Sequence, residues 1–402
     1  MSILSDIRVL DFSRYVAGPY CASILAALGA EVIRIEPPEG GEDRKLIPLG
    51  EKADGALFLQ LNRGKKSLAI NSASPRGREA IERLVPTADV VITNMPVKAL
   101  KKRGLDYETL QKLRGDIITT NLSAFGTKGP LRDKTGFDAV AQGVSGSAYL
   151  GGEPLYPSRA ASSYVDYGTG LAAAMGTLAA VIHRMKTGEG QDVQASLLAT
   201  ALTFINAAHI EAAVAGRDRQ PWGNRSPFSA PSDFFRTADG CIAVQVVGNL
   251  MFGRWASLIG RPELADDPRF ASDSDRGHHG AELSRIMQEW TAAKTTKQAL
   301  QMLEAAGVPG GPVYSPRQVA ADPCIAGSAM LSPTRYEGID VPLPLASFLV
   351  QMDCLDPGGA TPVPRIGQHT EELLRSVGYS PQEVRDLLEI ENVRNAIEGA
   401  RP

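Results

Sequence analysis

The chain has 402 residues, of which 43% are hydrophobic and 22% charged, close to the average of soluble globular proteins. This composition excludes intrinsic disorder, a collagen-like repeat and a coiled coil, and the length corresponds to two or three domains. With 42 basic and 45 acidic residues the net charge is −3. We therefore expect no nucleic-acid partner, because proteins that bind nucleic acids carry a positive excess.

Cysteine and histidine spacing argues against a metal site. The pair His278–His279 is interpreted as part of a loop, and the four cysteines stand too far apart for a disulfide framework or a zinc site: Cys21, Cys241, Cys324 and Cys354. The N-terminus lacks the charged and apolar regions of a signal peptide, and no uninterrupted apolar run reaches the ~18 residues of a membrane span. We expect a cytoplasmic protein with no membrane contact and no metal.

The first 36 residues predict a strand, a helix and a second strand. Ile7–Phe12 reads as a buried strand, Pro19 lies in the first turn of a helix that ends at Gly29, and the second strand follows. Alternation continues with predicted strands at 65–71, 89–94 and 116–123 and predicted helices at 75–85 and 107–113. The N-terminal region is therefore expected to form a doubly wound parallel sheet.

The pattern changes after Gly126, where a turn-rich loop and a stretch of small residues precede an alanine-rich helix at 166–185. The small side chains of this helix predict close packing against another helix. Two Gly- and Pro-rich connections, at 216–232 and 307–316, enclose a region with a predicted hairpin turn at Asp239-Gly240. These connections indicate domain boundaries.

Common nucleotide-binding and hydrolase motifs are absent. The chain has no G-x-x-x-x-G-K-[ST] and no G-x-S-x-G, and the first strand–helix turn reads SRYVAGP instead of G-x-G-x-x-G. Basic residues instead follow the predicted strands. Each alone is an ordinary surface charge, but together on one rim of the sheet they would suit a phosphorylated cofactor: Arg14, Arg63, Lys65, Lys66, Lys98, Lys101, Lys102 and Lys134.

Asp166 is the carboxylate of most interest, since it directly precedes a glycine-rich helix start, D-Y-G-T-G, in apolar surroundings. One interpretation is a helix N-cap, a role that Asp fills well. The other is a nucleophile toward an acyl group, held ionised by the helix dipole, with Gly168 and Gly170 allowing a substrate to approach. The residues alone leave both interpretations open.

Eight segments cover nearly the whole chain in order: VLDFSRYVAGPYCASILAALGAEVIRIEPP, LQLNRGKKSLAIN, ADVVITNMPVKALKKRGLDYETL, GFDAVAQGVSG, VDYGTGLAAAMGTLAAV, GRPELADDPRF, GVPGGPVYSPRQVAADP and VPRIGQHTEELL. These segments resemble the class III CoA-transferase family, which includes formyl-CoA transferase and carnitine CoA-transferase types and a branch of α-methylacyl-CoA racemases. The resemblance implies an α/β fold with a Rossmann-like large domain, formed by residues 1–215 and a return segment at 310–402. A smaller α+β domain at 225–305 and an interlocked homodimer are also implied.

The resemblance further implies an enzyme that moves CoA from an acyl-CoA donor to a small carboxylic acid. The family's nucleophile is the Asp of an Asp-x-x-x-Gly helix start, which matches Asp166 and Gly170 and favours the nucleophile over the cap. Asp166 would form a mixed anhydride and then an aspartyl-CoA thioester. No cofactor would be bound permanently, coenzyme A would enter as a substrate, and neither ATP nor a metal would be needed.

Positions that match the family's CoA contacts are Arg14, Tyr15, Val16, Ala17, Ile70, Asn94, Met95, Lys102 and Lys134. The chain departs from the pattern at Pro37-Pro38, where formyl-CoA transferase has an Arg, and at Met95, where Phe is common. Arg44 is therefore expected to take over part of the phosphate binding. Arg225 and the loop of Arg44 are candidates for the distal carboxylate of a dicarboxylic acceptor.

Two alternative functions remain open. The racemases place a proton-transferring His before the Asp of a G-x-D motif, whereas this chain has Phe137 there, in Gly136-Phe137-Asp138. Because phenylalanine cannot carry a proton, the transferase is favoured over the racemase. The other alternative is a non-catalytic CoA-binding protein, in which Asp166 only caps its helix and CoA never becomes covalently attached.

Overall fold

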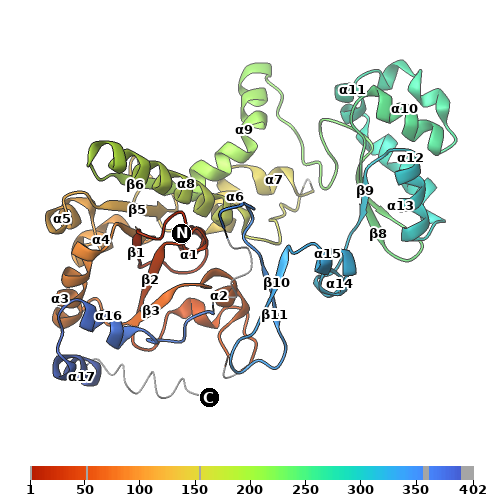
Figure 1. Ribbon diagram of the computed structural model, residues 1–402. Coiled ribbons are helices and arrows are strands. Elements are labelled where there is room, and N and C mark those ends of the chain that lie inside the picture. The colour runs from red at the N-terminus through yellow and green to blue at the C-terminus, as the bar shows by residue number, and fades with distance from the viewer. Residues whose placement is uncertain (1, 51–52, 154, 356–361, 391–402) are drawn as a thin grey trace. The chain divides into compact units, whose positions relative to one another are not determined.

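The computed structural model describes residues 2–50, 53–153, 155–355 and 362–390 (Figure 1). The chain divides into two compact units. We call them the large unit, which comprises Met1–Ser145, Ala160–Asn206 and Cys324–Pro402, and the small unit, which comprises Gly146–Arg159 and Ala207–Pro323.

A six-stranded parallel sheet forms the centre of the large unit, in the order β3-β2-β1-β4-β5-β6. Its strands are β1 (Arg8–Asp11), β2 (Glu31–Glu36), β3 (Lys66–Ala69), β4 (Val90–Thr93), β5 (Ile118–Ser123) and β6 (Asp192–Ser196). This arrangement confirms the predicted Rossmann-like α/β fold. The order reverses between β1 and β4, and in such sheets ligands bind in the crevice beyond the carboxyl ends of the strands at this point.

Helices cover both faces of this sheet. Alternate residues of β1 point to opposite faces, so that Val9 packs in one buried cluster with α1 (Ala17–Ala27) and α8 (Tyr164–Thr187), and Leu10 packs in another. The second cluster takes side chains from α3 (Pro75–Leu84), α4 (Val97–Arg103), α5 (Tyr107–Leu113), α16 (Thr370–Ser376) and α17 (Pro381–Ile390). Both faces of the parallel strands are therefore buried, as their continuous apolar runs predict.

The remaining elements of the large unit include the 3-10 turn η1 (Glu42–Lys45), α2 (Ala56–Leu61), α6 (Asp138–Val144) and the antiparallel pair β10 (Leu331–Thr334) and β11 (Leu343–Ala346). The chain enters the small unit twice: first for Gly146–Arg159, and again from Ala207, within α9 (Leu197–Ala215), to Pro323, the first residue of α15 (Pro323–Gly327).

The small unit contains a three-stranded antiparallel sheet of β7 (Ser232–Arg236), β8 (Cys241–Gln245) and β9 (Gly310–Pro312). The turn between β7 and β8 contains Asp239 and Gly240, as predicted. A core built around Phe235 and Trp255 joins one face of this sheet to α10 (Asn249–Leu258), α12 (Gly280–Ala292) and α13 (Thr296–Ala305). The unit also contains α7 (Ser147–Leu150), α11 (Asp273–His278) and α14 (Pro316–Ala321).

The return segment covers the open edge of β3. Ser67 N donates to His369 Nδ1 at 3.1 Å, and Ala69 N donates to Thr370 Oγ1 at 3.0 Å. Gly367 N donates to Ser67 Oγ at 2.8 Å. Side chains from the far end of the sequence thus satisfy backbone groups that an edge strand would otherwise expose.

Among the described residues, two helices are apolar enough to cross a membrane by length and composition alone, although neither contains an uninterrupted apolar run of that length. They are α8, with a mean hydropathy of 1.3, and α9, with 1.5. Core helices of globular proteins meet the same criteria, and α8 contributes Val165, Ala173 and Val181 to the buried cluster of the large unit. Only 11% of the apolar window of α9 is buried.

Candidate active site

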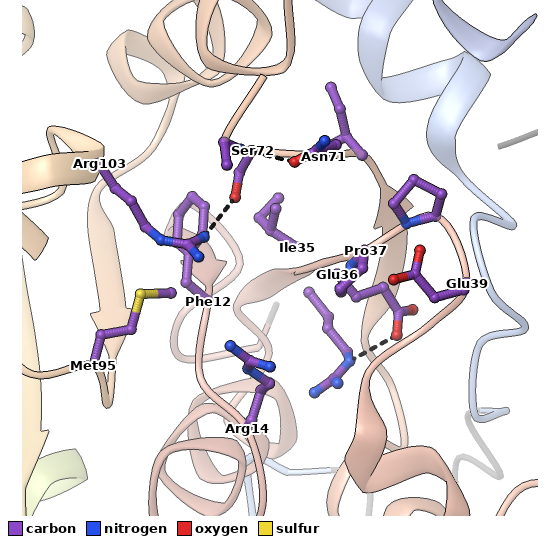
Figure 2. A pocket seen from close by; sticks show the side chains of 14 residues that line it. Phe12, Arg14, Ile35, Glu36, Pro37, Glu39, Asn71, Ser72, Met95 and Arg103 are labelled. Atoms are coloured by element: carbon purple, nitrogen blue, oxygen red, sulfur yellow. Dashed lines mark hydrogen bonds and ion pairs between the residues drawn. The ribbon is translucent and has the colours of Figure 1, made fainter. Parts of the chain in front are cut away.

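A cavity of about 500 Å³ opens at the carboxyl ends of β1, β2 and β3. Its walls are Phe12, Arg14, Arg34, Ile35, Glu36, Pro37, Pro38, Glu39, Ile70, Asn71, Ser72, Ala73, Met95 and Arg103 (Figure 2). Three of the predicted CoA contacts, Arg14, Ile70 and Met95, line this cavity. It lies where a doubly wound sheet binds ligands, and its volume is that of an ordinary small-molecule site.

Arg103 was not predicted from the sequence, yet it lines the cavity. It is the last residue of α4, and its Nη1 donates to Ser72 Oγ at 3.2 Å, a contact drawn in Figure 2. The adjacent Lys102 is exposed and does not line the cavity. The run Lys101-Lys102-Arg103 does signal basic charge in the last turn of a helix, but the rotation of that helix determines which side chain faces the cavity.

The loop between β1 and α1 is held by side chains from other elements. Arg14 N donates to Asn94 Oδ1 at 3.1 Å, and Asn94 Nδ2 donates to Arg14 O at 2.6 Å. Tyr15 adopts a left-handed φ of 70°, and its N donates to Asp43 Oδ2 at 3.3 Å. The structure thus brings the predicted Arg14, Tyr15 and Asn94 together. Val16 and Ala17 are buried at the start of α1.

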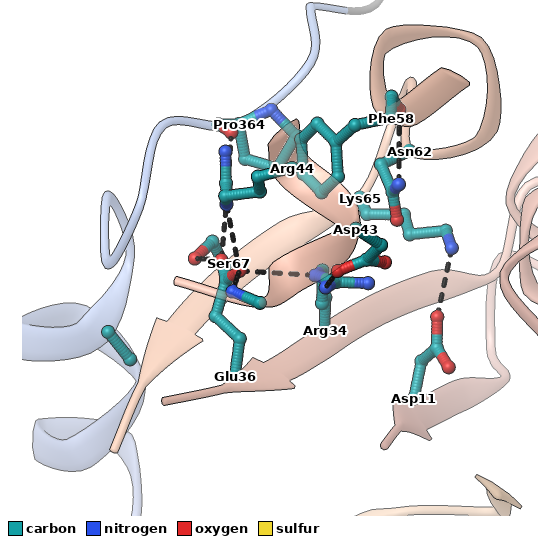
Figure 3. Close-up of polar contacts among 12 residues, drawn as sticks. Asp11, Arg34, Glu36, Asp43, Arg44, Phe58, Asn62, Lys65, Ser67 and Pro364 are labelled. Carbon is teal, nitrogen blue, oxygen red and sulfur yellow. Dashed lines mark hydrogen bonds and ion pairs between the residues drawn. The ribbon is translucent and has the colours of Figure 1, made fainter. Parts of the chain in front are cut away.

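A buried ion pair lies beneath this loop (Figure 3). Lys65 Nζ is 2.9 Å from Asp11 Oδ2 and donates to Pro19 O at 2.9 Å. Burial lowers the pKa of Lys65, although the Asp11 charge opposes the shift. Lys65 was expected on the basic rim of the sheet, but its ammonium group is enclosed and paired.

The expectation that Arg44 binds phosphate was wrong. Arg44 is buried, its Nη2 lies 2.7 Å from Glu36 Oε1, and its Nη1 lies 2.6 Å from Asp54 Oδ2 (Figure 3). Its guanidinium carbon stands 4.0 Å from the centre of the Phe58 ring. Burial alone would raise the pKa of Glu36, but the charges of Arg34 and Arg44 lower it to about 2. The donors of Arg44 are therefore committed within the protein.

The start of α1 packs against α8. A Cβ atom built on Gly170 would lie 2.7 Å from Ala17 O, and the rings of Tyr20 and Tyr167 meet edge-on with centroids 4.8 Å apart. The loop that lines the cavity at Arg14 therefore continues directly into the helix that abuts the Asp166 segment.

Asp166 is not the N-cap of its helix. Helix α8 begins at Tyr164, so Asp166 is its third residue, and the N-cap Ser163 makes no side-chain capping bond. The capping carboxylate comes instead from Asp138, whose Oδ2 accepts hydrogen bonds from Val165 N at 2.8 Å and Asp166 N at 3.1 Å. The interpretation of Asp166 as a cap is therefore wrong.

The pKa of the Asp166 carboxyl group is not lowered, as stabilisation of the carboxylate by the helix dipole would predict. Burial, together with the negative charge of Asp138, raises the pKa of Asp166 to about 7. A partly desolvated carboxyl group with a strongly raised pKa is a common sign of a functional site.

The two glycines near Asp166 serve packing. A Cβ atom on Gly168 would lie 2.5 Å from Phe204 Cζ of α9, and Gly170 is closed off by Ala17 and Tyr20. Protein atoms therefore occupy the Cβ position of both glycines, and the approach of a substrate to their backbone stays a prediction.

The remaining predicted residues lie elsewhere. Lys134 is exposed in the loop before α6. Arg225 belongs to the small unit, where it lines a second cavity of about 430 Å³ together with Asn224, Ser226, Ser232, Asp233, Phe234, Ala243, Val244, Gln245, Pro309 and Gly310. Within the described residues, no three His, Cys, Asp or Glu side chains converge as a metal site would require.

Comparison with known proteins identifies the family. The model of CoA-transferase family III matches residues 4–370. The chain is 33% identical over 385 residues to succinate–glutarate CoA-transferase of Agrobacterium fabrum, covering 92% of this chain and 94% of that protein. It is 30% identical over 391 residues to human succinyl-CoA:glutarate CoA-transferase, covering 96% and 88%.

Solved structures that are similar to this chain support the same family. A CAIB/BAIF family protein from Brucella suis superimposes with a TM-score of 0.81 at 30% identity, covering 94% of this chain and 99% of that one. Rv3272 from M. tuberculosis gives a TM-score of 0.81 at 29% identity, covering 93% and 99%. The resemblance stated from the sequence motifs is confirmed: the chain belongs to CoA-transferase family III and is a class III CoA-transferase.

Proposed function

We propose that this enzyme transfers CoA from succinyl-CoA to a small dicarboxylic acid, with Asp166 as the nucleophile. The observation that carries the proposal is the half-buried Asp166 carboxyl group with its raised pKa, whose helix packs against α1, the helix that follows the cavity-lining loop. The donor and acceptor are suggested by the relatives, whose names pair succinyl-CoA or succinate with glutarate, D-citramalate or mesaconate.

CoA is proposed to bind in the cavity at the ends of β1, β2 and β3. Arg14 and Arg103 would bind its phosphates, and Ile70 and Met95 would contact the adenine. Among the other predicted contacts, Tyr15, Val16, Ala17 and Asn94 would shape the loop beside the cavity, and the exposed Lys102 and Lys134 would contribute positive charge. No permanently bound cofactor is needed.

The proposed reaction exchanges thioesters and carboxylates without redox chemistry. An Asp166 oxygen attacks the succinyl carbonyl, the C–S bond breaks, and the electron pair leaves with the CoA sulfur. The thiolate then attacks the Asp166 carbonyl carbon, which gives an aspartyl-CoA thioester and releases succinate. The acceptor carboxylate attacks this thioester, and the returning thiolate attacks the acceptor's acyl carbon, so that Asp166 is regenerated.

We also propose that the enzyme acts as an interlocked homodimer. Its support in this chain is α9, on which three apolar side chains are exposed by more than half: Phe204 by 57%, Ile210 by 55% and Val214 by 83%. A second subunit would remove such a surface from water.

Mass spectrometry of the intact protein tests this function. After incubation with succinyl-CoA, the wild type is expected to gain a CoA-sized mass that hydroxylamine removes, whereas Asp166→Asn gains none. Asp6→Asn, a substitution at an exposed residue of the large unit, serves as the control and should behave like the wild type. Transfer to glutarate, malate and mesaconate is then followed by identifying the CoA product.

Three outcomes would contradict the proposal. Equal adduct on wild type and Asp166→Asn would place the nucleophile elsewhere. Exchange of the α-proton of a 2-methylacyl-CoA, without CoA transfer, would establish the racemase alternative. Binding of CoA with neither adduct nor transfer would leave a non-catalytic CoA-binding protein.

A further inference from the structure

We infer that Asp138 is a positioning residue for the reaction at Asp166, because its carboxylate caps the first turn of α8 and its negative charge disfavours the free nucleophile relative to its covalent forms. The inference rests on the proposed role of Asp166. The racemases differ from this chain at residue 137, whereas the side chain that contacts the first turn of α8 is that of the next residue, Asp138.

The position of Asp138 is strongly constrained. It is the first residue of α6 and is buried, with 6% of its surface exposed. Its Oδ2 accepts hydrogen bonds from Val165 N at 2.8 Å and Asp166 N at 3.1 Å, and its Oδ1 accepts one from Gln142 Nε2 at 2.5 Å. Three donors thus hold one carboxylate against the backbone of the nucleophile itself.

Gln142 fixes the orientation of this arrangement. Its side chain is buried, with 1% of the residue exposed, and its Oε1 accepts a hydrogen bond from Ala160 N at 2.9 Å. The amide group therefore cannot rotate by half a turn without losing one bond on each side. The segment that leads into α8 is tied through Gln142 to Asp138 and from there to the first turn of the helix.

All three donors to Asp138 are electrically neutral. Among the described residues, neither Asp138 nor Asp166 forms an ion pair with a Lys, Arg or His side chain within 4.0 Å. A helix N-terminus ordinarily stabilises a carboxylate, but here Asp138 already occupies the backbone N–H groups of Val165 and Asp166. Asp166 is left half-buried beside a like charge, and desolvation and that charge together raise its pKa to about 7.

Other titratable groups near Asp166 are few. Tyr167 on the same helix interacts with Asp166, and Tyr20 of α1 contacts the ring of Tyr167. Helix α9 presents Thr200 and Phe204 to this part of α8, and neither side chain titrates. Asp138 is therefore the charged neighbour whose removal should change the ionisation of Asp166.

The effect of Asp138 on the reaction depends on what happens to the negative charge of the Asp166 carboxylate. When Asp166 forms the anhydride, its negative charge leaves with the CoA sulfur, and when the thioester forms, it leaves with the released carboxylate. Both covalent forms of Asp166 are neutral, so the repulsion from Asp138 exists only in the free enzyme. Asp138 thus shifts the equilibrium from free carboxylate toward covalent adduct and makes the free carboxylate more basic.

The variant Asp138→Asn tests this inference, since its side-chain oxygen can still accept the backbone N–H bonds. We expect the acidic limb of the kcat/KM pH profile to move down by about one pH unit. The equilibrium ratio of covalent adduct to free enzyme should fall about tenfold, because one pKa unit corresponds to a tenfold change. Asp138→Glu, which keeps the charge, should retain the acidic limb of the wild type even where its misplaced carboxylate lowers the rate.

A role in capping alone would give a different result. Asp138→Asn would then lower the melting temperature while leaving both the acidic limb and the adduct ratio unchanged, and this outcome would overturn the inference. If Asp138→Asn does not fold, the same measurements are made on Asp138→Ser, a second neutral variant with a capping hydroxyl. If the wild type forms the adduct but the acidic limb of Asp138→Asn does not move, only the role of Asp138 is refuted. If the wild type forms no adduct, the role of Asp166 as the nucleophile is refuted as well.

Discussion

Ala17 O and Gly170 meet so closely that a Cβ atom on residue 170 would lie 2.7 Å from the carbonyl oxygen. The contact joins the first residue of α1 to the helix that carries Asp166, three residues beyond the cavity-lining Arg14. The helix that follows the cavity-bordering loop and the helix of the proposed nucleophile are therefore in close contact at this point.

Gly170→Ala is expected to push α1 and α8 apart. Overpacking of this kind costs about 1–3 kcal/mol of unfolding free energy, and displacement of the loop should also weaken CoA binding. Urea unfolding and titration calorimetry with CoA measure the two effects. Gly253→Ala in α10, where a Cβ atom would meet nothing within 4 Å, is the matched control and should be neutral or stabilising. Equal behaviour of the two variants would contradict the prediction.

Lys65→Met is expected to destabilise the large unit strongly. It removes the partner of the buried Asp11 carboxylate, and breaking a buried pair from one side costs about 3–5 kcal/mol. The double variant Lys65→Met/Asp11→Asn should recover part of this loss, because it leaves no uncompensated charge. A double-mutant cycle in urea measures the coupling; no recovery in the double variant would show that the ion pair is not the cause.

The stability of the return segment should depend on pH through His369. Burial lowers its pKa, and the neutral ring accepts a hydrogen bond from Ser67 N. The unfolded chain binds a proton near pH 6.5, so this contribution is complete above that pH and is lost as pH falls through 6.5 toward the lower folded pKa.

The variant His369→Asn keeps an acceptor that does not titrate. Its unfolding free energy, measured in urea at pH 7.5 and pH 5.5, should change less between the two than that of the wild type. An equal change in both proteins would assign the pH dependence to other groups.

Arg103 and Lys102 allow the proposed CoA cavity to be tested with adjacent residues. Arg103→Ala should raise the Kd for CoA about tenfold or more, as expected for a charge-assisted hydrogen bond of about 1.5–3 kcal/mol. Lys102→Ala should have a smaller effect, because its exposed ammonium group is screened by water and salt. Titration calorimetry measures the Kd for CoA of both variants. A larger loss of affinity in Lys102→Ala than in Arg103→Ala would place the phosphates outside the cavity.

Local patterns in the sequence were sufficient to predict most of the secondary structure. The helix Tyr107–Leu113 and the hairpin at Asp239-Gly240 follow from capping, periodicity and turn residues, which depend only on neighbours along the chain. The buried strands β1 and β4 were recognisable in the same way. Such signals are local, so they do not require knowledge of which distant segments meet.

Pairing between distant residues could not be predicted. Arg44 resembles a surface arginine until Glu36 and Asp54 are known to surround it. Similarly, the cap of α8 comes from Asp138, 28 residues before Asp166. Gly168 lies beside Asp166 in sequence, yet the ring that fills its space belongs to α9. These side chains acquire their roles only when the tertiary structure sets their partners and their burial.

The return segment that covers the edge of β3 is synthesised long after the strand itself. The backbone N–H of Ser67 gains its acceptor only when His369, 302 residues later in the chain, has been synthesised. At about 5–20 residues per second, a ribosome needs about 15–60 s to make that stretch. During this interval the nascent sheet has an unprotected edge, so chains truncated before residue 366 should aggregate through β3 and depend on chaperones for solubility.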